Sequence, residues 1–251
     1  MLNYLSIDLE SWAMPNTPEF LQLKSQQKKR LDNGHAEKST LKILDILQKT
    51  KTKTTFFIVG QIYQWYPKLV EKITRDGHEV AFHTHAHDPL PDESSLIRSL
   101  ELSKEFIQKF KPIGFRAPRI NFGKKYFPIL KKYGFKYDSS SYGEFYSQFV
   151  YKKVKEFPVS AWKKIPIGSG YFIGLLGNHI DKVYQRLNRS NTPFISFLHN
   201  WQILSPLKPT FPTRSYLITH PHYFPYLKNT SKSLEYLVKK FSISPMKNLL
   251  Q

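Results

Sequence analysis

Short apolar runs alternate with amphipathic segments along the first part of the chain. The runs predict buried strands over residues 2–9, 54–59 and 80–82. Between them, apolar residues at helical spacing predict a helix capped by Ser39 and a second helix over 61–75. An order of strand, helix, strand, helix, strand is typical of parallel βα units, so the pattern predicts an α/β fold.

The same pattern continues to the end of the chain. It predicts further helices over 92–110, 124–133, 180–188 and 234–241, and further strands over 113–118, 135–139, 157–160 and 193–198. Residues 11–33 are predicted to be a long loop or an irregular helix, and residues 200–230 a loop with His220 and His222 at the surface. The glycine-punctuated segment 168–177 lacks the Lys-Ser/Thr of a phosphate loop and predicts no nucleotide site.

No repeat or composition shift marks a second domain. We expect one domain over residues 1–251, with a motif core over 2–202 and a C-terminal loop and closing helix over 203–251. Hydrophobic residues make up 40% of the chain, which is enough for a sizeable core. Because the sequence has no cysteine, disulfides and thiolate metal sites are excluded, and any metal must bind nitrogen and oxygen ligands.

The chain is strongly basic, with a formal net charge of +19. Such an excess favours phosphate-bearing substrates, an anionic membrane surface or nucleic acid as partners. The lysines are scattered in pairs and no nucleic-acid-binding motif is present, so nucleic acid is the least favoured partner. The chain starts directly with a strand-like run and has no apolar stretch that would span a bilayer, so we expect a cytoplasmic protein, with peripheral contact at the inner membrane face as an option.

Three histidines, His83, His85 and His87, directly follow the apolar run that ends at Phe82. In an extended segment residues two and four apart point the same way, and in a helical turn residues four apart share a face. His83 and His87 can therefore converge on one point in either geometry. Imidazole is the commonest protein ligand for divalent transition metals, so the cluster favours a metal site over a merely polar loop. A carboxylate must come from elsewhere in the chain.

Two carboxylates, Asp8 and Glu10, lie at the end of the first predicted strand. In continued β geometry they face the same side, and the carboxyl ends of strands are where α/β barrels place their chemistry. A strand-end acid that caps the next turn is the alternative. The residues at successive predicted strand ends are Asp8 and Glu10, His83 and His87, Arg116, and His199. This combination of acid, imidazole and guanidinium is hard to assign to packing.

These motifs, in this order, resemble the polysaccharide deacetylase family, carbohydrate esterase family 4, which includes chitin, peptidoglycan and nodulation-factor deacetylases. SIDLE at 6–10 stands in the place of the family's aspartate pair, and HTHAH at 83–87 matches its His-Ser/Thr-x-x-His motif. RAP at 116–118 and LH at 198–199 match two further motifs, and Trp162 stands for the tryptophan of another. The Asp-x-Glu form resembles the branch associated with surface polysaccharide and lipopolysaccharide biosynthesis.

The resemblance implies a distorted (β/α) barrel with its site at the carboxyl ends of the strands. It implies a divalent metal, most readily zinc, bound by Glu10, His83 and His87, with Asp8 as general base, Arg116 orienting Asp8, and His199 as general acid. The reverse assignment of Asp8 and Glu10 stays open. The candidate substrate-binding residues are Trp12, Pro118, Trp162, Tyr171 and Trp201.

The implied reaction is removal of an N-acetyl group from an amino sugar. We expect a lipid-linked or nucleotide-linked precursor, with a diphosphate link as one form, because the basic surface suits phosphate groups. One alternative is hydrolysis of another C–N bond, such as that of a formamide or a cyclic ureide, with or without a metal. The other is a non-catalytic sugar-binding scaffold. Release of formate rather than acetate would separate the first alternative from the deacetylase.

Overall fold

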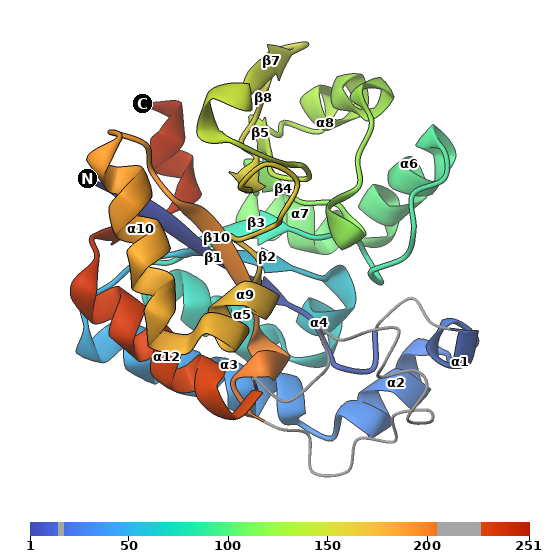
Figure 1. The fold of residues 1–251 in the computed structure, drawn as a ribbon. Helices are drawn as coiled ribbons and strands as arrows, with labels where there is room; N and C mark the ends of the chain where they lie inside the picture. Colours follow the sequence, from blue (N-terminus) through green and yellow to red (C-terminus); the bar gives the residue numbers. More distant parts are fainter. Residues whose placement is uncertain (15–17, 205–226) are drawn as a thin grey trace.

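One curled, mainly parallel sheet forms the centre of the molecule. The computed structural model describes residues 1–14, 18–204 and 227–251 (Figure 1). The strands follow the order β10-β1-β2-β3-β4-β5-β8-β7, with β11 beside β1, and only β7 and β8 pair antiparallel. Their bounds are β1 Asn3–Leu9, β2 Thr55–Ile58, β3 Glu79–Phe82, β4 Gly114–Phe115, β5 Tyr137–Asp138, β7 Phe149–Tyr151, β8 Val154–Glu156, β10 Ile195–His199 and β11 Ile243–Ser244.

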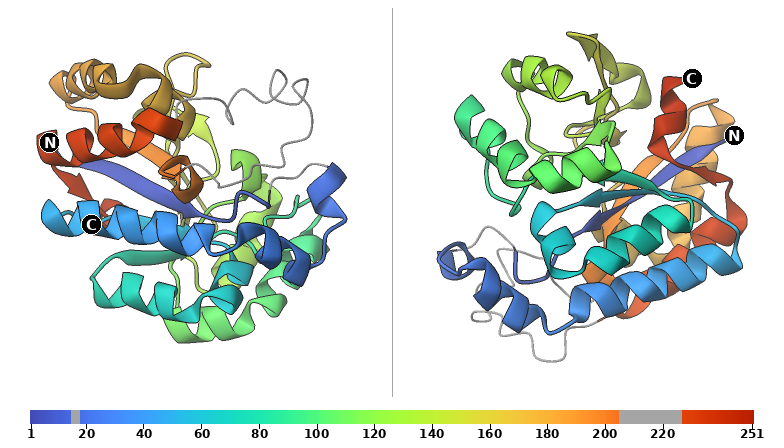
Figure 2. Two further views of the ribbon diagram at one scale, coloured as in Figure 1. Left: turned by 90° about the horizontal axis from the view of Figure 1, so that it is seen from below. Right: turned by 180° about the vertical axis from the view of Figure 1, so that it is seen from behind.

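Helices surround the outer side of this sheet (Figures 1 and 2). The longest are α3 (His35–Lys49), α10 (Ile180–Arg189), α12 (Leu227–Lys240) and α6 (Glu93–Leu102). The shorter helices are α1 Pro18–Leu21, α2 Ser25–Asp32, α4 Gly60–Trp65, α5 Pro67–Arg75, α7 Lys104–Phe110, α8 Phe127–Lys132 and α9 Gly170–Leu176. Single 3-10 turns are η1 Pro118–Ile120, η2 Lys124–Tyr126, η3 Phe145–Ser147, η4 Gly177–His179, η5 Asn200–Gln202 and η7 Met246–Leu250. None of the helices in the described part of the chain is long and apolar enough to cross a membrane.

Strand β1 shows how the sheet separates the core from the site. Leu5, Ile7 and Leu9 belong to the large apolar cluster that the strands share with the surrounding helices. Because successive side chains of a strand point to opposite faces, Ser6 and Asp8 project to the other, concave side. Both faces of β1 are buried, as expected for a central parallel strand.

The sheet does not close into a complete barrel. Its path ends at β7 on one side and at β10 on the other. A two-stranded sheet, β6 (Tyr142–Gly143) with β9 (Val159–Ser160), lies next to β10. Ile195 N donates to Ser160 Oγ at 2.9 Å and Phe197 N donates to Gly168 O at 2.9 Å, so this segment covers the free edge of β10. The predicted distorted (β/α) barrel is confirmed.

Several predicted helix boundaries were wrong. The helix predicted over 61–75 is two helices, α4 and α5, because Pro67 has no N–H to continue the first one. The helix predicted over 92–110 breaks at Ser103 into α6 and α7, although its N-cap, Asp92, accepts a hydrogen bond from Ser95 N as expected. Ser39 is not an N-cap but lies inside α3, where its hydroxyl donates to His35 O.

The predicted strands exist but are shorter than expected. Those over 113–118 and 135–139 are reduced to β4 and β5, and the hairpin of β7 and β8 was not predicted. The segment 168–177, for which no helix was predicted, contains α9. His220 and His222 lie outside the described residues, as does most of the loop predicted over 200–230.

The crowded interior makes a prediction at Gly114. A Cβ there would collide with the ring of Tyr137, which is fully buried and donates to Glu79 Oε1 at 3.0 Å. Gly114→Ala should therefore lower the free energy of unfolding by about 1–3 kcal/mol in urea titrations. Gly123→Ala is the control, because its Cβ would meet only ordinary contacts, and should change stability by less than about 0.5 kcal/mol. Equal effects at the two positions would contradict this packing.

Candidate active site

A buried salt bridge lies at the carboxyl ends of β1 and β4. Arg116 Nη1 contacts Asp8 Oδ1 at 2.6 Å, and both side chains are almost completely buried. Asp8 is the last polar residue of β1 to face the concave side, and Arg116 directly follows β4. Parallel pairing of the intervening strands brings the two ends to one edge of the sheet, as the sequence predicted.

The guanidinium of Arg116 has further polar partners and aromatic neighbours. Its Nε donates to Ser139 O, its Nη2 donates to Ser139 Oγ and its Nη1 donates to Ser6 Oγ, each at 2.9 Å. The rings of Phe57 and Phe197 lie 4.1 and 5.1 Å from its Cζ. A buried charge is tolerated when it is both paired and hydrogen-bonded, and Arg116 meets both conditions. The network holds the Asp8 carboxylate in one orientation.

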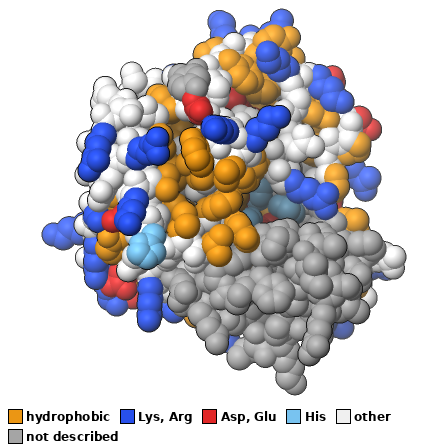
Figure 3. Space-filling model, viewed as in Figure 1, with side chains coloured by type: hydrophobic (Ala, Val, Ile, Leu, Met, Phe, Trp, Pro, Cys, Tyr) orange, Lys and Arg blue, Asp and Glu red, His pale blue; other side chains and the backbone are white. Residues whose placement is uncertain are grey.

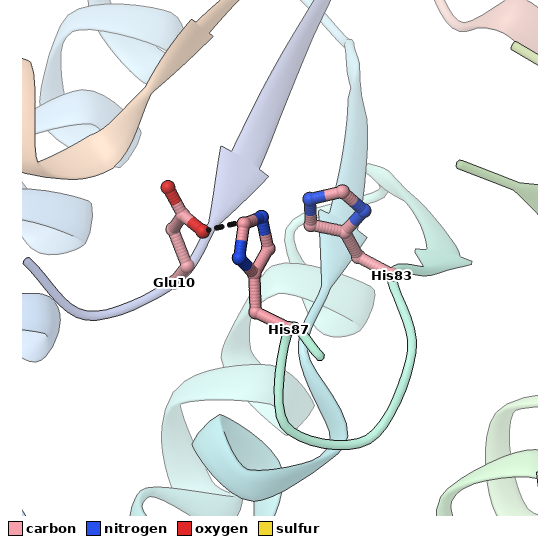
Figure 4. A group of neighbouring side chains, drawn as sticks. All are labelled: Glu10, His83 and His87. Carbon is pink, nitrogen blue, oxygen red and sulfur yellow. Dashed lines mark ion pairs between the residues drawn. The ribbon is translucent and has the colours of Figure 1, made fainter. Parts of the chain in front are cut away.

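Three predicted metal ligands converge beside this salt bridge. Potential ligand atoms of Glu10, His83 and His87 all lie within 4.8 Å of one another. Figure 4 shows the Glu10 carboxylate, from the segment after β1, facing the two imidazoles of the loop after β3. Among the described residues this is the one such group, and all three members are buried.

The loop after β3 brings the two imidazoles together through an unusual backbone. Thr84 and His87 both have a φ of 60°, which is rare for residues other than glycine. Gly60 N donates to Thr84 O at 2.9 Å and Gln61 N donates to His85 O at 2.8 Å, so the start of α4 holds the loop in place. His85 points elsewhere, with its Nδ1 2.9 Å from Ser103 Oγ, and supports the loop against α7.

The hydrogen bonding of His83 prepares it for a metal. Its Nδ1 lies 2.7 Å from Arg116 O, and because a carbonyl can only accept, Nδ1 carries the proton. In a neutral imidazole Nε2 then keeps a lone pair. Burial lowers the pKa of His83 to about 3, with the Arg116 charge acting in the same direction, so the ring is neutral at ordinary pH. This tautomer is the one that metal-binding histidines adopt when their other nitrogen bonds a carbonyl.

Only one of the two carboxylate oxygens of Glu10 accepts a hydrogen bond from the described residues. Its Oε1 accepts from Trp201 Nε1 at 2.9 Å, but its buried Oε2 has no hydrogen-bond donor within the described chain, although His87 Nε2 lies 3.1 Å away. Burial raises the pKa of Glu10 to about 8; the Trp201 hydrogen bond opposes this and the charge of Asp8 adds to it. A buried oxygen lacking a donor, facing imidazole lone pairs, is what a cation would satisfy.

Positive charges lie near His87 and were not anticipated. Burial holds the pKa of His87 well below its usual value, and the charges of Arg119 and Lys28 act in the same direction. Lys28 lies in α2, where only 5% of its surface is exposed. From the sequence, Lys28 was considered only as part of one of the scattered lysine pairs, so its burial near the site was missed. These cations keep the ligand imidazole deprotonated.

His199 ends β10 directly beside Asp8, its partner in the strand register. Its Nε2 lies 3.4 Å from Glu10 Oε1, and its ring stacks on Trp201 at 4.7 Å between centroids. With 22% of its side chain exposed, His199 is the most accessible of the predicted catalytic groups. It therefore lies at the opening of the site, between the buried acids and solvent.

The predicted substrate-binding residues do not form one group. Trp12 and Trp201 are buried in a small apolar cluster next to Glu10 and His199. Pro118 is buried at the start of η1, two residues after the salt-bridged Arg116. Trp162 is exposed and lines a different pocket, and Tyr171 is half-buried on α9 with its ring against Phe172. Contact of any of them with a sugar stays a prediction.

Sequence reasoning missed the residues that hold the site together. Ser6 and Ser139 bind the Arg116 guanidinium, and Asn200 Oδ1 accepts from Glu10 N at 3.1 Å. Two of these residues could have been recognised from the sequence, because Ser6 shares a strand face with Asp8 and Asn200 directly follows His199. Tyr142, on β6, is near enough to feel the charges of Arg116 and Asp8, while burial of its hydroxyl raises its pKa to about 12.

The chain also matches models of known protein families. The model of the polysaccharide deacetylase family matches residues 30–137. Over these residues the chain is a member of the polysaccharide deacetylase family. A second model, described as a domain of unknown function (DUF3473), matches residues 126–251. The predicted family membership is thus confirmed.

Individual relatives agree with this assignment. A peptidoglycan-N-acetylglucosamine deacetylase of Bacillus cereus is 27% identical over 129 residues, 50% of this chain and 58% of that protein. A putative polysaccharide deacetylase structure from Mycobacterium smegmatis superposes with a TM-score of 0.65 at 15% identity, covering 98% of this chain and 89% of the other. A family 4 pseudoenzyme from Bacillus anthracis gives 0.52 at 15% identity, covering 100% and 65%. The structures show a shared fold.

Because Glu10, His83 and His87 converge, we predict that this polysaccharide deacetylase family member binds a metal ion. Purified wild-type protein offered zinc should hold about one ion per chain by elemental analysis. His83→Ala removes a ligand and should weaken binding at least about 10- to 100-fold, so that dialysis strips the ion. His179→Ala, an exposed histidine on η4, should keep the wild-type content. Loss in both variants, or in neither, would contradict the site.

The raised pKa of Glu10 predicts how metal affinity depends on pH. Because the pKa of Glu10 is about 8 while burial keeps both imidazoles neutral, binding below pH 8 must release one proton, from Glu10. The apparent affinity for zinc should rise about tenfold per pH unit from pH 6 to 8 and then level off. Competition with a chromophoric chelator measures this. A flat profile over that range would show that Glu10 is already ionised without metal.

Proposed function

We propose that this chain is a metal-dependent hydrolase that removes the N-acetyl group from an amino sugar. The observation that carries the proposal is the buried cluster of Glu10, His83 and His87 beside the Asp8–Arg116 salt bridge. A structural role alone does not explain why a buried carboxyl lacks a donor next to two neutral imidazoles. Family membership and the deacetylase activity named for the Bacillus cereus relative support the same reaction class.

The donor set fits a zinc-type ion. Glu10, His83 and His87 would hold it, as two nitrogens and one oxygen leave one open position in tetrahedral coordination. When bound, such an ion supplies Lewis acidity and lowers the pKa of bound water towards about 7. The Arg116 carbonyl contributes by fixing the tautomer of His83. Arg116 thus orients His83 through its carbonyl and Asp8 through its guanidinium.

Asp8 is the proposed general base. Its Oδ1 is engaged by Arg116 at 2.6 Å, and no described residue donates a hydrogen bond to its Oδ2. That oxygen can take the proton of the water whose oxygen bonds to the acetyl carbon. Arg116 positions the carboxylate and stays charged, since a guanidinium does not lose its proton in proteins. Glu10 and not Asp8 lies among the ligand atoms, which favours the assignment of Glu10 as ligand and Asp8 as base.

His199 is the proposed general acid. Breaking the C–N bond yields acetate and an amine, and the departing nitrogen must gain a proton. His199 lies opposite Asp8 in the strand register and is partly exposed, so its imidazole can exchange protons with solvent between turnovers. Stacking on Trp201 holds the ring in place. The site therefore has a base and an acid on neighbouring strands.

For the substrate, we propose a lipid-linked or nucleotide-linked precursor of a surface polysaccharide or lipopolysaccharide. The net charge of +19 supports a phosphate-bearing carrier. Peripheral contact with an anionic membrane fits the same charge. A cytoplasmic location, expected from the sequence, stays a prediction.

Two alternative functions, a hydrolase of another C–N bond and a non-catalytic scaffold, can be distinguished by the products they give. The Bacillus anthracis neighbour shows that this fold also occurs in a pseudoenzyme, so the fold by itself does not imply turnover. Against a scaffold role, this chain keeps a complete set of base, ligands, arginine and acid, which a sugar-binding module does not need. Hydrolysis of a formamide or a cyclic ureide would use the same groups and is separated by its product.

The decisive experiment follows acetate and formate release from N-acetylated chitooligosaccharides by zinc-loaded protein. Wild type should release acetate. Asp8→Asn removes the base and should lower kcat by about 10²- to 10⁴-fold with zinc content retained. Asp45→Asn, which changes an exposed i,i+4 ion pair with Lys49, is the control and should leave kcat within about twofold.

Formate from a formylated sugar, with no acetate from its acetylated analogue, would replace the proposal by the first rival. Zinc-loaded wild type that binds chitooligosaccharides without releasing either acid would favour the scaffold. An Asp8→Asn variant as active as wild type would remove Asp8 from the proposed mechanism and leave the base to another group.

A further inference from the structure

A second pocket lies beside β10, away from the metal ligands. It has a volume of about 470 Å³, within the range of small-molecule sites. It lies between the β6–β9 segment and α10. The residues that line it are Glu144, Phe145, Ser160, Ala161, Trp162, Ile167, Lys182, Val183, Arg186, Leu187, Ser190 and Thr192.

The walls of this pocket are mainly apolar. Val183 and Leu187 lie four residues apart on α10 and so share one helix face, which borders the pocket. Phe145, Ala161 and Ile167 complete the wall on the other side. Ser160 offers little hydrogen bonding, because its Oγ already accepts from Ile195 N. Such a lining suits a hydrocarbon chain better than a nucleotide base, which needs polar partners.

The rim carries positive charge without internal partners. Lys182 and Arg186 are exposed, lie four residues apart on α10, and form no ion pair or side-chain hydrogen bond within the described chain. Lys163 and Lys164 follow Trp162 on the adjoining turn and are exposed as well. Glu144 is the one acid among the lining residues. Two free cations on one side of an apolar pocket complement an anionic head group.

An exposed apolar surface continues outward from the pocket. Trp162, in the pocket lining, is 51% exposed, and Ile165, which pairs with Trp162 in a β-bridge, is 40% exposed. In Figure 3 hydrophobic side chains gather near the middle of this face, with lysine and arginine side chains at their edge and histidines visible in a hollow beside them. Clustered apolar surface of this kind marks interaction sites more often than ordinary surface.

The pocket and the metal ligands lie at opposite ends of one strand. Ser160 contacts the start of β10 at Ile195, whereas His199 ends the same strand beside Glu10. Four residues of strand span about 13 Å. A molecule bound in the pocket by one end could therefore reach the proposed catalytic groups with the other.

We propose that this pocket binds the hydrocarbon chain of a lipid phosphate, with Lys182 and Arg186 holding the phosphate. The inference rests on the proposed function, because it makes the lipid phosphate the carrier of the amino sugar and selects it over a nucleotide. It adds a binding site that lies outside the catalytic cluster. A single-chain amphiphile, rather than a bilayer surface, suits a half-open pocket of about 470 Å³.

Calorimetric titration with dodecyl phosphate below its micelle concentration tests the site. Wild type should bind it at least tenfold more tightly than inorganic phosphate or dodecanol. The double variant Lys182→Ala/Arg186→Ala should lose at least tenfold in affinity. Lys131→Ala/Lys132→Ala, which removes two exposed lysines of α8, is the matched control and should bind as wild type.

Fluorescence gives a second readout that does not depend on charge. Dodecyl phosphate with a terminal bromine should quench Trp162, one of four tryptophans, and Trp162→Phe should remove most of that quenching. Equal affinity of the Lys182→Ala/Arg186→Ala variant, equal binding of dodecanol, or unchanged quenching in Trp162→Phe would each overturn the proposal. Binding to phosphatidylglycerol vesicles without binding of monomeric dodecyl phosphate would overturn it too, and would assign this face to a membrane surface.

The test separates this site from the catalytic proposal. His83→Ala should bind dodecyl phosphate as wild type does, although it loses the metal. Acetate release from chitooligosaccharides without dodecyl phosphate binding would keep the proposed function and remove this site. Dodecyl phosphate binding without acetate release from any N-acetylated sugar would remove the carrier role of the lipid together with the proposed function.

Discussion

The salt bridge between Asp8 and Arg116 is the constraint on which the site depends. A guanidinium with no exposed surface must find its partners inside the protein, and those partners come from β1, from Ser139 after β5, and from the rings of Phe57 and Phe197. Removing one member would leave an unpaired buried charge, at a cost of about 3–5 kcal/mol. Strand register and catalytic geometry are therefore stabilised by the same contacts.

Arg116 also links the proposed base to the metal ligands. Its guanidinium binds Asp8 while its carbonyl fixes the tautomer of His83. The loop that carries His83 and His87 reaches its conformation through positive φ angles at Thr84 and His87, which cost free energy and persist only where neighbouring contacts determine them. Hydrogen bonds from Gly60 and Gln61 provide those contacts. The backbone strain therefore lies in the loop that turns the His83 and His87 imidazoles towards the Glu10 carboxylate.

The sequence predicted what depends on local pattern. Asp8, Arg116 and His199 could be placed together because the carboxyl ends of parallel strands share one edge of the sheet, whatever the details of packing. What depends on contacts between distant segments was missed. The burial of Lys28 in α2 and the support of Arg116 by Ser139 come from tertiary packing, which hydrophobic periodicity does not encode. Ser39 was mistaken for a helix cap because α3 begins one turn earlier, at His35, without a side-chain cap.

Strand β10 connects the two sites that the proposals describe. Its carboxyl end presents His199 to the acids of β1, and its amino end lies against the segment that lines the apolar pocket. The sheet path stops at β10, so one edge of this strand is free to pair with residues 160–168 instead of another barrel strand. A fully closed barrel would have no such edge. The distortion of the barrel is thus what allows an apolar pocket to form at the other end of the strand that carries His199, the proposed general acid.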